Sequence, residues 1–242
     1  MGSSSEADTF LQSAELYDAI YHFKNYQRES ERLRGLIDEL VPDARTLLDV
    51  ACGTGEHAKF LKQYYVVDGI DLNDSYLEAA RLKNPSGTYA RADMTDFDLR
   101  ARYDVVTCLF SAIGYVKTVE SVGRAISSMA RHVRMGGALI VEPWVPPHRW
   151  QPGTLSINTG ETRHGLVCRM ALSRRQDKLS VISLHYLYGT RAGIHYYTEQ
   201  LELGLFTKEE MAHAFDLAGM HVAYDPQGLI GRGLYIGTFF PR

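Results

Sequence analysis

Short apolar runs alternate with amphipathic segments between residues 46 and 142 of the chain. The apolar runs predict strands over 46–50, 65–70, 89–92, 103–109 and 137–142, and the amphipathic segments predict helices over 56–63, 75–83 and 119–132. Strands that alternate with helices at this rhythm pair in parallel. The pattern therefore predicts an α/β fold with a doubly wound, Rossmann-like and mostly parallel sheet, whose ligands bind at the carboxyl ends of the strands.

The segment before this region has a helical pattern. Apolar residues spaced three and four apart predict helix within 13–40. The helical region ends at Val41-Pro42-Asp43, because proline disfavours a continuing helix.

The pattern changes again after Pro143. Segments rich in Tyr, Val, Leu and Thr predict antiparallel strands over 166–174, 179–188 and 194–205, separated by good turn sequences. A capping box, Thr207 with Glu210, then begins a helix that ends at Leu217, and 234–240 predicts a closing strand. The C-terminal half is thus expected to add an antiparallel strand layer over the ligand edge of the sheet.

Composition narrows the possible partners. Among the 242 residues, 26 are Lys or Arg and 29 are Asp or Glu, and a net charge of −3 gives no reason to expect nucleic acid or an anionic membrane as partner. The cysteines, Cys52, Cys108 and Cys168, are far apart, and no Cys/His spacing resembles a metal site. Met1–Glu6 lacks the basic and apolar regions of a secretory signal, and no run of about 18 apolar residues exists to span a membrane. We therefore expect a cytoplasmic protein with reduced thiols and no metal.

The strongest local motif is the segment 47–55, Leu-Leu-Asp-Val-Ala-Cys-Gly-Thr-Gly. It reads as a buried strand, a tight G-x-G turn and a helix start, and glycines in such a turn let a ligand approach the backbone closely. Asp71 ends the next predicted strand, where an acid can accept both hydroxyl protons of a ribose. The order of these features predicts a nucleoside-type cofactor rather than an ordinary turn.

Two cofactors remain open at this point. The third position of the G-x-G-x-x-G fingerprint is Ala58, a tolerated variant, so NAD is not excluded. However, Asp93 and Met94 follow the third strand, where an acid and an apolar side chain could hold adenine. The order D-V-A-C-G-T-G, an acid ending strand two, A-D-M after strand three and R-M-G-G before strand five resembles class I S-adenosylmethionine-dependent methyltransferases across 46–142. The resemblance implies S-adenosylmethionine as cofactor and methyl transfer as the reaction.

The chain also resembles bacterial N,N-dimethyltransferases that act on nucleotide-linked amino sugars. The similar stretches are 16–18, 24–26, 110–115, 141–144, 184–186, 205–207 and 231–234. This resemblance implies one or two in-line methyl transfers to the amine of such a sugar. It also implies a helical lid over 1–45 and a methyltransferase domain over 46–242, with an acceptor-site insertion at about 160–205. The chain departs from the family pattern at Val145, which follows Trp144, and at Asn25, which lies between Lys24 and Tyr26. These departures bear on the identity of the acceptor and not on the cofactor site.

The resemblance implies roles for individual residues. The cofactor-binding residues would be Tyr17, Tyr26, Ala51, Gly53, Gly55, Asp71, Leu72, Asp93, Met94 and Leu109. The acceptor-binding residues would be Tyr115, Glu142, Trp144, His185 and Arg232. His185 and Tyr115 are the catalytic candidates, and a histidine pKa suits a base near neutral pH. The ordinary interpretations are a solvent-facing strand histidine for His185 and a structural hydrogen bond for Glu142.

Other functions stay open from the sequence alone. They are N- or O-methylation of another small natural product or metabolite, a cofactor-binding partner protein without catalysis, and an NAD-dependent oxidoreductase. The expected partner is a small-molecule acceptor, and the protein is expected to be a monomer or a homodimer.

Overall fold

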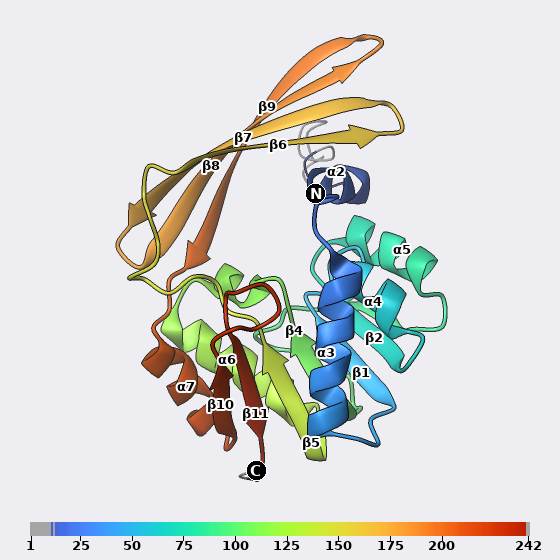
Figure 1. The fold of residues 1–242 in the computed structure, drawn as a ribbon, viewed down its shortest axis with the longest axis vertical. Helices are drawn as coiled ribbons and strands as arrows, with labels where there is room; N and C mark the ends of the chain where they lie inside the picture. Colours follow the sequence, from blue (N-terminus) through green and yellow to red (C-terminus); the bar gives the residue numbers. More distant parts are fainter. Residues whose placement is uncertain (1–10, 12, 241–242) are drawn as a thin grey trace.

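The computed structural model describes residue 11 and residues 13–240, so the prediction for Met1–Glu6 lies outside the described residues. Among them, seven strands form a central sheet in the order β10-β11-β5-β4-β1-β2-β3 (Figure 1). The strands are β1 (Thr46–Val50), β2 (Val66–Asp71), β3 (Tyr89–Arg91), β4 (Tyr103–Cys108), β5 (Val133–Val141), β10 (His221–Asp225) and β11 (Leu234–Thr238). Strands β1 to β5 pair in parallel, whereas β11 and β10 are antiparallel. The doubly wound, mostly parallel sheet is confirmed, and its order reverses between β1 and β4.

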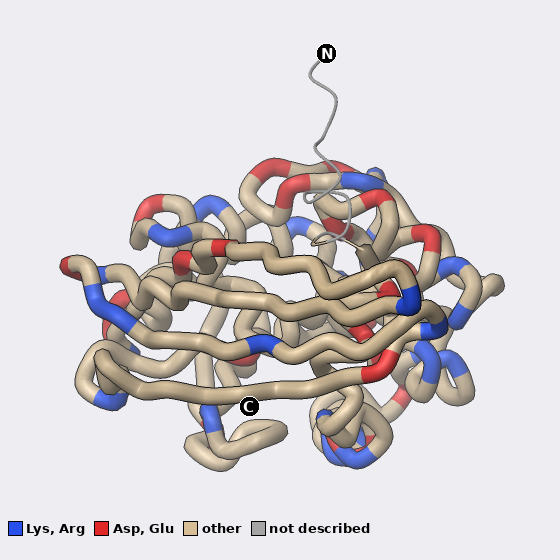
Figure 2. The backbone as a smooth tube through the Cα atoms, turned by 90° about the horizontal axis from the view of Figure 1, so that it is seen from above, with Lys and Arg blue, Asp and Glu red and all other residues tan. Residues whose placement is uncertain are grey.

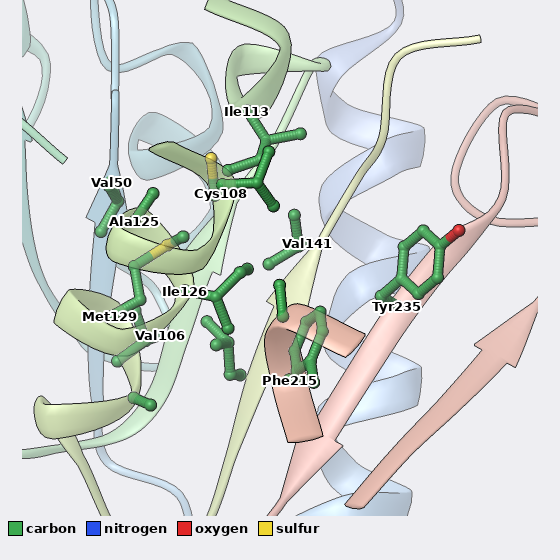
Figure 3. Packing of buried hydrophobic residues seen from close by; sticks show 14 of the residues in the cluster. Val50, Val106, Cys108, Ile113, Ala125, Ile126, Met129, Val141, Phe215 and Tyr235 are labelled. Carbon is green, nitrogen blue, oxygen red and sulfur yellow. The ribbon is translucent and has the colours of Figure 1, made fainter. Parts of the chain in front are cut away.

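Helices cover both faces of this sheet because each strand in its middle is apolar on both sides. Side chains of α3 (Tyr26–Leu40) and α4 (Glu56–Leu61) pack on one face. The amphipathic α6 (Val119–Arg131) and α7 (Lys208–Leu217) pack on the other (Figure 3). Helix α5 (Asp74–Lys83) contacts α4 and strands β2 and β3. The carboxyl ends of β1 and β4 are left for ligands.

A separate antiparallel sheet lies beyond those carboxyl ends (Figure 1). In the described part of the chain its strands are β6 (Leu155–Thr162), β7 (Gly165–Gln176), β8 (Leu179–Thr190) and β9 (Gly193–Gly204), in sequence order. The predicted strand layer is confirmed, but it begins earlier than predicted. Strand β6 was not predicted, because its apolar side chains Leu155 and Ile157 point to solvent rather than into a core.

The predicted helical region 13–40 is two helices with a break over 21–25. Helix α2 (Ala14–Ile20) is capped by Ser13, and α3 begins where the Asn25 side chain accepts the N–H of Arg28. The two helices pack on different sheets. Leu16, Ala19 and Ile20 of α2 are buried with Val167, Leu184 and Tyr186 of the four-stranded sheet. The break between α2 and α3 therefore joins the two sheets.

The face of the four-stranded sheet that points away from α2 is apolar and exposed. Its large side chains, each more than half exposed, are Leu155, Ile157, Leu166, Met170, Leu187, Ile194 and Tyr196. The strand register places them on one face, which we call the outer face. Figure 2 shows these long strands crossing the molecule with most charged positions near their ends.

The remaining predicted boundaries agree closely with the structure. Apart from β5, which begins at Val133 rather than at 137, they differ by at most two residues at either end. Strand β10 was not predicted, since its short sequence at the sheet edge carries little alternation. None of the described helices is long and apolar enough to span a bilayer.

Gly160 tests how closely α2 is docked. A Cβ at Gly160 of β6 would lie 2.3 Å from the carbonyl oxygen of Ala19 at the end of α2. We expect Gly160→Ala to displace α2 and the residues it carries, because a backbone oxygen cannot rotate away. Calorimetry with S-adenosylhomocysteine should show binding weakened by about tenfold, or about 1.4 kcal/mol.

Gly189→Ala is the matched control in the same sheet. A Cβ there would meet nothing closer than 3.9 Å. Equal affinity in both variants and the unchanged protein would contradict the close docking of α2.

Candidate active site

The turn after β1 is held in an unusual backbone conformation. Ala51, Gly53 and Gly55 all have positive φ angles, of 57°, 56° and 76°. The Asp71 carboxylate, at the end of β2, accepts the N–H of Gly53 at 2.9 Å and that of Asn73 at 2.9 Å. Burial raises the pKa of Asp71. Asp71 therefore fixes the shape of the turn from the neighbouring strand.

The two glycines of the turn serve different purposes. A Cβ on Gly53 would meet no atom within 4 Å, so this glycine borders open space. A Cβ on Gly55 would lie 2.9 Å from Cα and Cβ of Ala80 in α5. Gly55 thus permits the close approach of α4 and α5. This packing explains why the position is a glycine, apart from its predicted place in the cofactor site.

A pocket opens beside Gly53 at the point where the strand order reverses. Its walls come from the ends of β1 and β4, from the start of α4, and from α2 and α3. The lining residues are Tyr17, Tyr26, Asp49, Ala51, Cys52, Gly53, Thr54, Glu56, His57, Leu109 and Phe110. Five predicted cofactor residues, Tyr17, Tyr26, Ala51, Gly53 and Leu109, therefore line one pocket. The other predicted positions lie at the neighbouring strand ends.

Asp49 is a buried acid in the wall of this pocket, which Glu56 also lines. It is 3% exposed and accepts the Thr107 hydroxyl at 2.9 Å. Burial raises its pKa to about 6, and the nearby charge of His57 opposes this shift. A cationic group in the pocket would relieve the cost of this buried carboxylate.

Tyrosines of α2 and α3 line one side of the pocket. The Tyr17 ring lies 4.7 Å from the ring of Tyr21 and 5.1 Å from that of Tyr76 in α5. Tyr26 meets His57 edge to face at 5.0 Å. Burial raises the pKa of Tyr17, Tyr26 and Tyr76 well above the usual value, so these hydroxyls stay protonated at neutral pH.

A buried ionic cluster attaches the break between α2 and α3 to α4. Glu29 of α3 pairs with Lys24, and Nε2 of His57 lies 2.9 Å from the same carboxylate. The Lys24 ammonium also lies 4.4 Å from the centre of the Phe110 ring. Because both charges are nearly out of solvent, loss of either partner would leave an uncompensated buried charge.

The loop after β4 is strained and held by Glu142. Phe110 and Ser111 have φ angles of 50° and 62°, which residues other than glycine rarely adopt. The Glu142 carboxylate accepts the Phe110 N–H at 2.6 Å, and the Ser111 hydroxyl donates to the Pro143 carbonyl at 2.8 Å. Arg232 donates to Ser111 at 2.9 Å. The role seen here for Glu142 is the structural hydrogen bond.

Three of the predicted acceptor residues meet at this loop. The guanidinium of Arg232 lies 4.9 Å from the Trp144 ring centre and 5.6 Å from that of Phe110. Burial lowers the pKa of Arg232, and the charge of Glu142 opposes this. Tyr115 follows on the short helix η1 (Ala112–Val116), with 54% of its surface exposed.

The face of the four-stranded sheet that packs on α2, which we call the inner face, brings further polar groups toward the same loop. Arg169 of β7 donates to the Tyr21 hydroxyl at 3.2 Å, and the Tyr21 ring contacts Phe110 edge to face at 5.2 Å. Tyr186 of β8 donates to Glu199 of β9 at 3.1 Å. We use the word cleft for the region where these polar groups of the inner face lie near the strained loop after β4.

His185 does not lie in the cleft. Side chains alternate along β8, and since Leu184 and Tyr186 face α2, His185 faces the opposite way. It is exposed on the outer face, where its Nδ1 lies 2.5 Å from the Tyr196 hydroxyl. This corrects the prediction that His185 borders the acceptor as a base, and agrees with the alternative of a solvent-facing strand histidine.

The remaining predicted cofactor residues lie where β2 and β3 end. Leu72 is 57% exposed, directly after Asp71. Asp93 is exposed and accepts the N–H and the hydroxyl of Thr95, both at 2.8 Å. Met94 packs against the core. This edge is continuous with the glycine turn, but the structure does not bring Asp93 into the pocket beside Gly53.

Sequence reasoning missed several residues of the site. Asp49 had a visible signal, since it is an acid within an otherwise apolar strand. His57 and Phe110 had none beyond their position after the motifs. Tyr21, Arg169 and Glu199 could not be found, because only the packing of α2 on the sheet brings them together.

Comparison with known proteins agrees with this geometry. A methyltransferase domain family matches residues 47–137. The dTDP-3-amino-3,6-dideoxy-α-D-glucopyranose N,N-dimethyltransferase of Streptomyces fradiae is 38% identical, over 96% of this chain and 92% of the relative. A dTDP-3-amino-3,4,6-trideoxy-α-D-glucopyranose N,N-dimethyltransferase of Streptomyces venezuelae is 34% identical, over 93% of this chain and 97% of the relative. The chain belongs to this family of amino-sugar N,N-dimethyltransferases.

Solved structures of the amino-sugar methyltransferases share the whole fold. The crystal structure of Streptomyces venezuelae DesVI has a TM-score of 0.86 at 31% identity and covers 98% of this chain and 99% of its own. S-adenosylmethionine-bound CalS10, an amino pentose methyltransferase from Micromonospora echinaspora, has a TM-score of 0.84 at 32% identity and covers 99% and 100%. The enzyme is an S-adenosylmethionine-dependent methyltransferase, which excludes the oxidoreductase alternative.

The pocket fits S-adenosylmethionine on two observations. The absent Cβ of Gly53 leaves open space beside the turn, where a nucleoside can approach the backbone. The buried Asp49 carboxylate offers a negative charge to the cationic methionine end of the cofactor.

Asp49 gives a prediction with opposite effects on stability and binding. An aspartate in an unfolded chain has a pKa of about 3.9, whereas Asp49 titrates at about 6. The folded state binds the proton more tightly, so stability falls as pH rises from about 4 to about 6. We expect Asp49→Asn to be more stable than the unchanged protein at pH 7.5, by at most about 3 kcal/mol, and equally stable near pH 4.

The same variant should bind S-adenosylhomocysteine more weakly, since the cationic end of that ligand loses its counter-charge. Thermal unfolding at both pH values and calorimetry measure the two effects, with Asp43→Asn, an exposed acid before β1, as control. A stability difference that is the same at both pH values would show that the charge of Asp49 is not the cause.

Proposed function

We propose that this methyltransferase transfers one or two methyl groups to the amine of an amino sugar carried on a nucleotide diphosphate. The observation that carries the proposal is the set of polar side chains on the inner face of the four-stranded sheet. The four-stranded sheet stands over the cofactor pocket and presents hydroxyls, one carboxylate and one guanidinium toward it, a surface suited to a polar acceptor. The dTDP-amino-sugar acceptors named for the 38% and 34% identical relatives support the same class.

The cofactor-binding roles follow the strand ends. Tyr17 and Tyr26 close over the methionine end from the lid, over 1–45, while Ala51, Gly53 and Leu109 line the pocket. Asp71 would take the ribose and Leu72, Asp93 and Met94 the adenine, while Gly55 keeps α4 against α5. The sulfonium of bound S-adenosylmethionine supplies a methyl group that an amine lone pair can displace.

The chain's own residues position the acceptor. Tyr115 lies on η1, directly after the strained loop, where its ring and hydroxyl would border the point of transfer. Arg232 offers a planar guanidinium for the diphosphate, held in place by Trp144, Phe110 and Ser111. Glu142 keeps that loop in its strained shape. Alignment of the acceptor with the cofactor supplies most of the rate gain in such a displacement.

No tyrosine of the cleft suits the role of general base. Burial and neighbouring hydroxyls or carboxylates raise the pKa of Tyr17, Tyr76 and Tyr186 above the usual value. These hydroxyls therefore serve as hydrogen-bond donors and acceptors at neutral pH. An amine acceptor does not need a strong base, because its ammonium form loses a proton readily near neutral pH.

Two measurements test the proposed function. We expect calorimetry to show binding of S-adenosylhomocysteine, and mass spectrometry to show one or two added methyl groups on dTDP-3-amino-3,6-dideoxyglucose. Methylation of simple amines but of no nucleotide sugar would favour another small-molecule acceptor. Binding without any methylation, across a panel of amines, alcohols and nucleotide sugars, would favour a non-catalytic partner protein.

We also propose that the protein is a homodimer rather than a monomer and works in the cytoplasm. Monomeric proteins rarely expose an apolar patch larger than a few hundred Å², and the outer face presents seven large apolar side chains. A second copy of the same face can cover them about a two-fold axis. The unpaired cysteines suit a reducing compartment.

Leu187→Asp should convert the dimer to a monomer in sedimentation equilibrium, because it buries a charge at the middle of the contact. The matched control is Leu82→Asp on α5, where the leucine is 85% exposed and far from the outer face. A protein that is monomeric before substitution would refute the dimer.

A further inference from the structure

We infer that Glu199 recognises the charged amine of the acceptor and that Tyr186 positions its carboxylate. The inference rests on the proposed function and names the part of the site that selects an amine over a hydroxyl. No motif in the sequence pointed to Glu199, which lies on the last strand of the antiparallel sheet.

The strand register places Glu199 on the inner face. Glu199 pairs with Leu184, and Tyr197 pairs with Tyr186, in the antiparallel ladder of β8 and β9. Residues paired across a ladder share a face, and Leu184 and Tyr186 are buried against α2. Glu199 therefore points toward the cleft, with its carboxylate held at 3.1 Å by the Tyr186 hydroxyl.

The groups around Glu199 place it across the cleft from the cofactor side. Its charge, together with that of Asp71, contributes to the raised pKa of both Tyr76 and Tyr115. Burial is the larger cause of both shifts, and the two charges show that Tyr76 and Tyr115 are near both Glu199 and the turn that Asp71 supports. Tyr21 also adds to the raised pKa of Tyr76 and Tyr115.

The positive charge of Arg169 limits where on the inner face an ammonium can bind. Arg169 is buried and hydrogen-bonded to Tyr21 and to Asn158 at 3.2 Å each, on the β7 side of Tyr186. His195 and Tyr197 share the inner side of β9, with ring centres 6.3 Å apart. An ammonium would therefore bind on the β9 side of Tyr186, near Glu199 and away from the guanidinium.

Asp71, Asp18 and Glu29 already have hydrogen-bond or ionic partners, whereas Glu142 uses one oxygen and keeps the other, Oε1, buried and without a hydrogen-bond partner among the described residues. Asp71 accepts two backbone N–H groups, and Asp18 pairs with Lys83 at 2.6 Å and accepts the Thr54 hydroxyl. Glu29 pairs with Lys24, and Glu142 supports Phe110. Glu199 is exposed, and within the described part of the chain its hydrogen-bond donor is a neutral hydroxyl. This carboxylate keeps capacity for a cation.

The chemistry of N-methylation accounts for such a group. The ammonium gives its proton to the Glu199 carboxylate, and the proton leaves to bulk water because that side chain is exposed. The nitrogen lone pair then forms the N–C bond with the methyl carbon, while the S–C bonding pair goes to sulfur and leaves a neutral thioether. The product is a methylammonium, which must lose a proton in the same way before a second transfer.

The test compares a charged and an uncharged ligand on the same protein. Calorimetry on the S-adenosylhomocysteine complex measures the affinity for dTDP-3-amino-3,6-dideoxyglucose and for the analogue with a hydroxyl in place of the amine. Glu199→Gln should weaken binding of the amino sugar by about tenfold, the effect of losing one solvent-exposed charge-assisted hydrogen bond, and that of the hydroxyl analogue by less than about twofold. Tyr186→Phe should weaken amino-sugar binding by a smaller factor.

Glu161→Gln on β6 is the matched control, because it makes the same change of charge on the outer face of the same sheet. Equal losses for the two ligands, or no loss for either, would overturn the inference while the proposed function stands. If the unchanged protein binds S-adenosylhomocysteine but neither nucleotide sugar, the acceptor class is wrong and the inference fails with it.

Discussion

The packing of α2 on the four-stranded sheet is the contact on which the rest of the site depends. Leu16, Ala19 and Ile20 are buried against that sheet rather than against the central one. The contact is so close that β6 needs a glycine, Gly160, where the end of α2 passes. The helix that carries Tyr17 toward the cofactor pocket therefore belongs, in its packing, to the layer that faces the acceptor.

This arrangement connects the pocket proposed for the cofactor to the sheet face proposed for the acceptor. The break over 21–25 leaves α2 on one sheet and α3 on the other. The buried Lys24–Glu29 ion pair, with the contact of His57 Nε2 to Glu29, connects the break to α4. Phe110 then contacts Tyr21 from the lid side, with Lys24 and Arg232 over its ring. A displacement of α2 and the break would therefore also move residues of the pocket, of the strained loop and of the inner face of the antiparallel sheet.

Much of the fold was predictable because apolar periodicity reports burial directly. The parallel strands are buried on both faces and stood out as apolar runs, and the glycine turn stood out by its φ requirements. Five of the residues predicted to bind the cofactor line one pocket, because they lie in or beside these local motifs. Strand β6 was missed because its apolar residues face outward, so its pattern did not resemble a half-buried strand next to a core.

The acceptor side was less predictable for a physical reason. In a strand, a shift of one residue reverses the face, so the stretch Leu184-His185-Tyr186 identified the right strand but not which side chain enters the cleft. The sequence alone determined a doubly wound methyltransferase with a glycine turn after β1, because those features are local in the chain. Only the tertiary structure decided that Tyr186 and Glu199 face the cleft and His185 faces outward, because the docking of α2 selects which face of the sheet is inside.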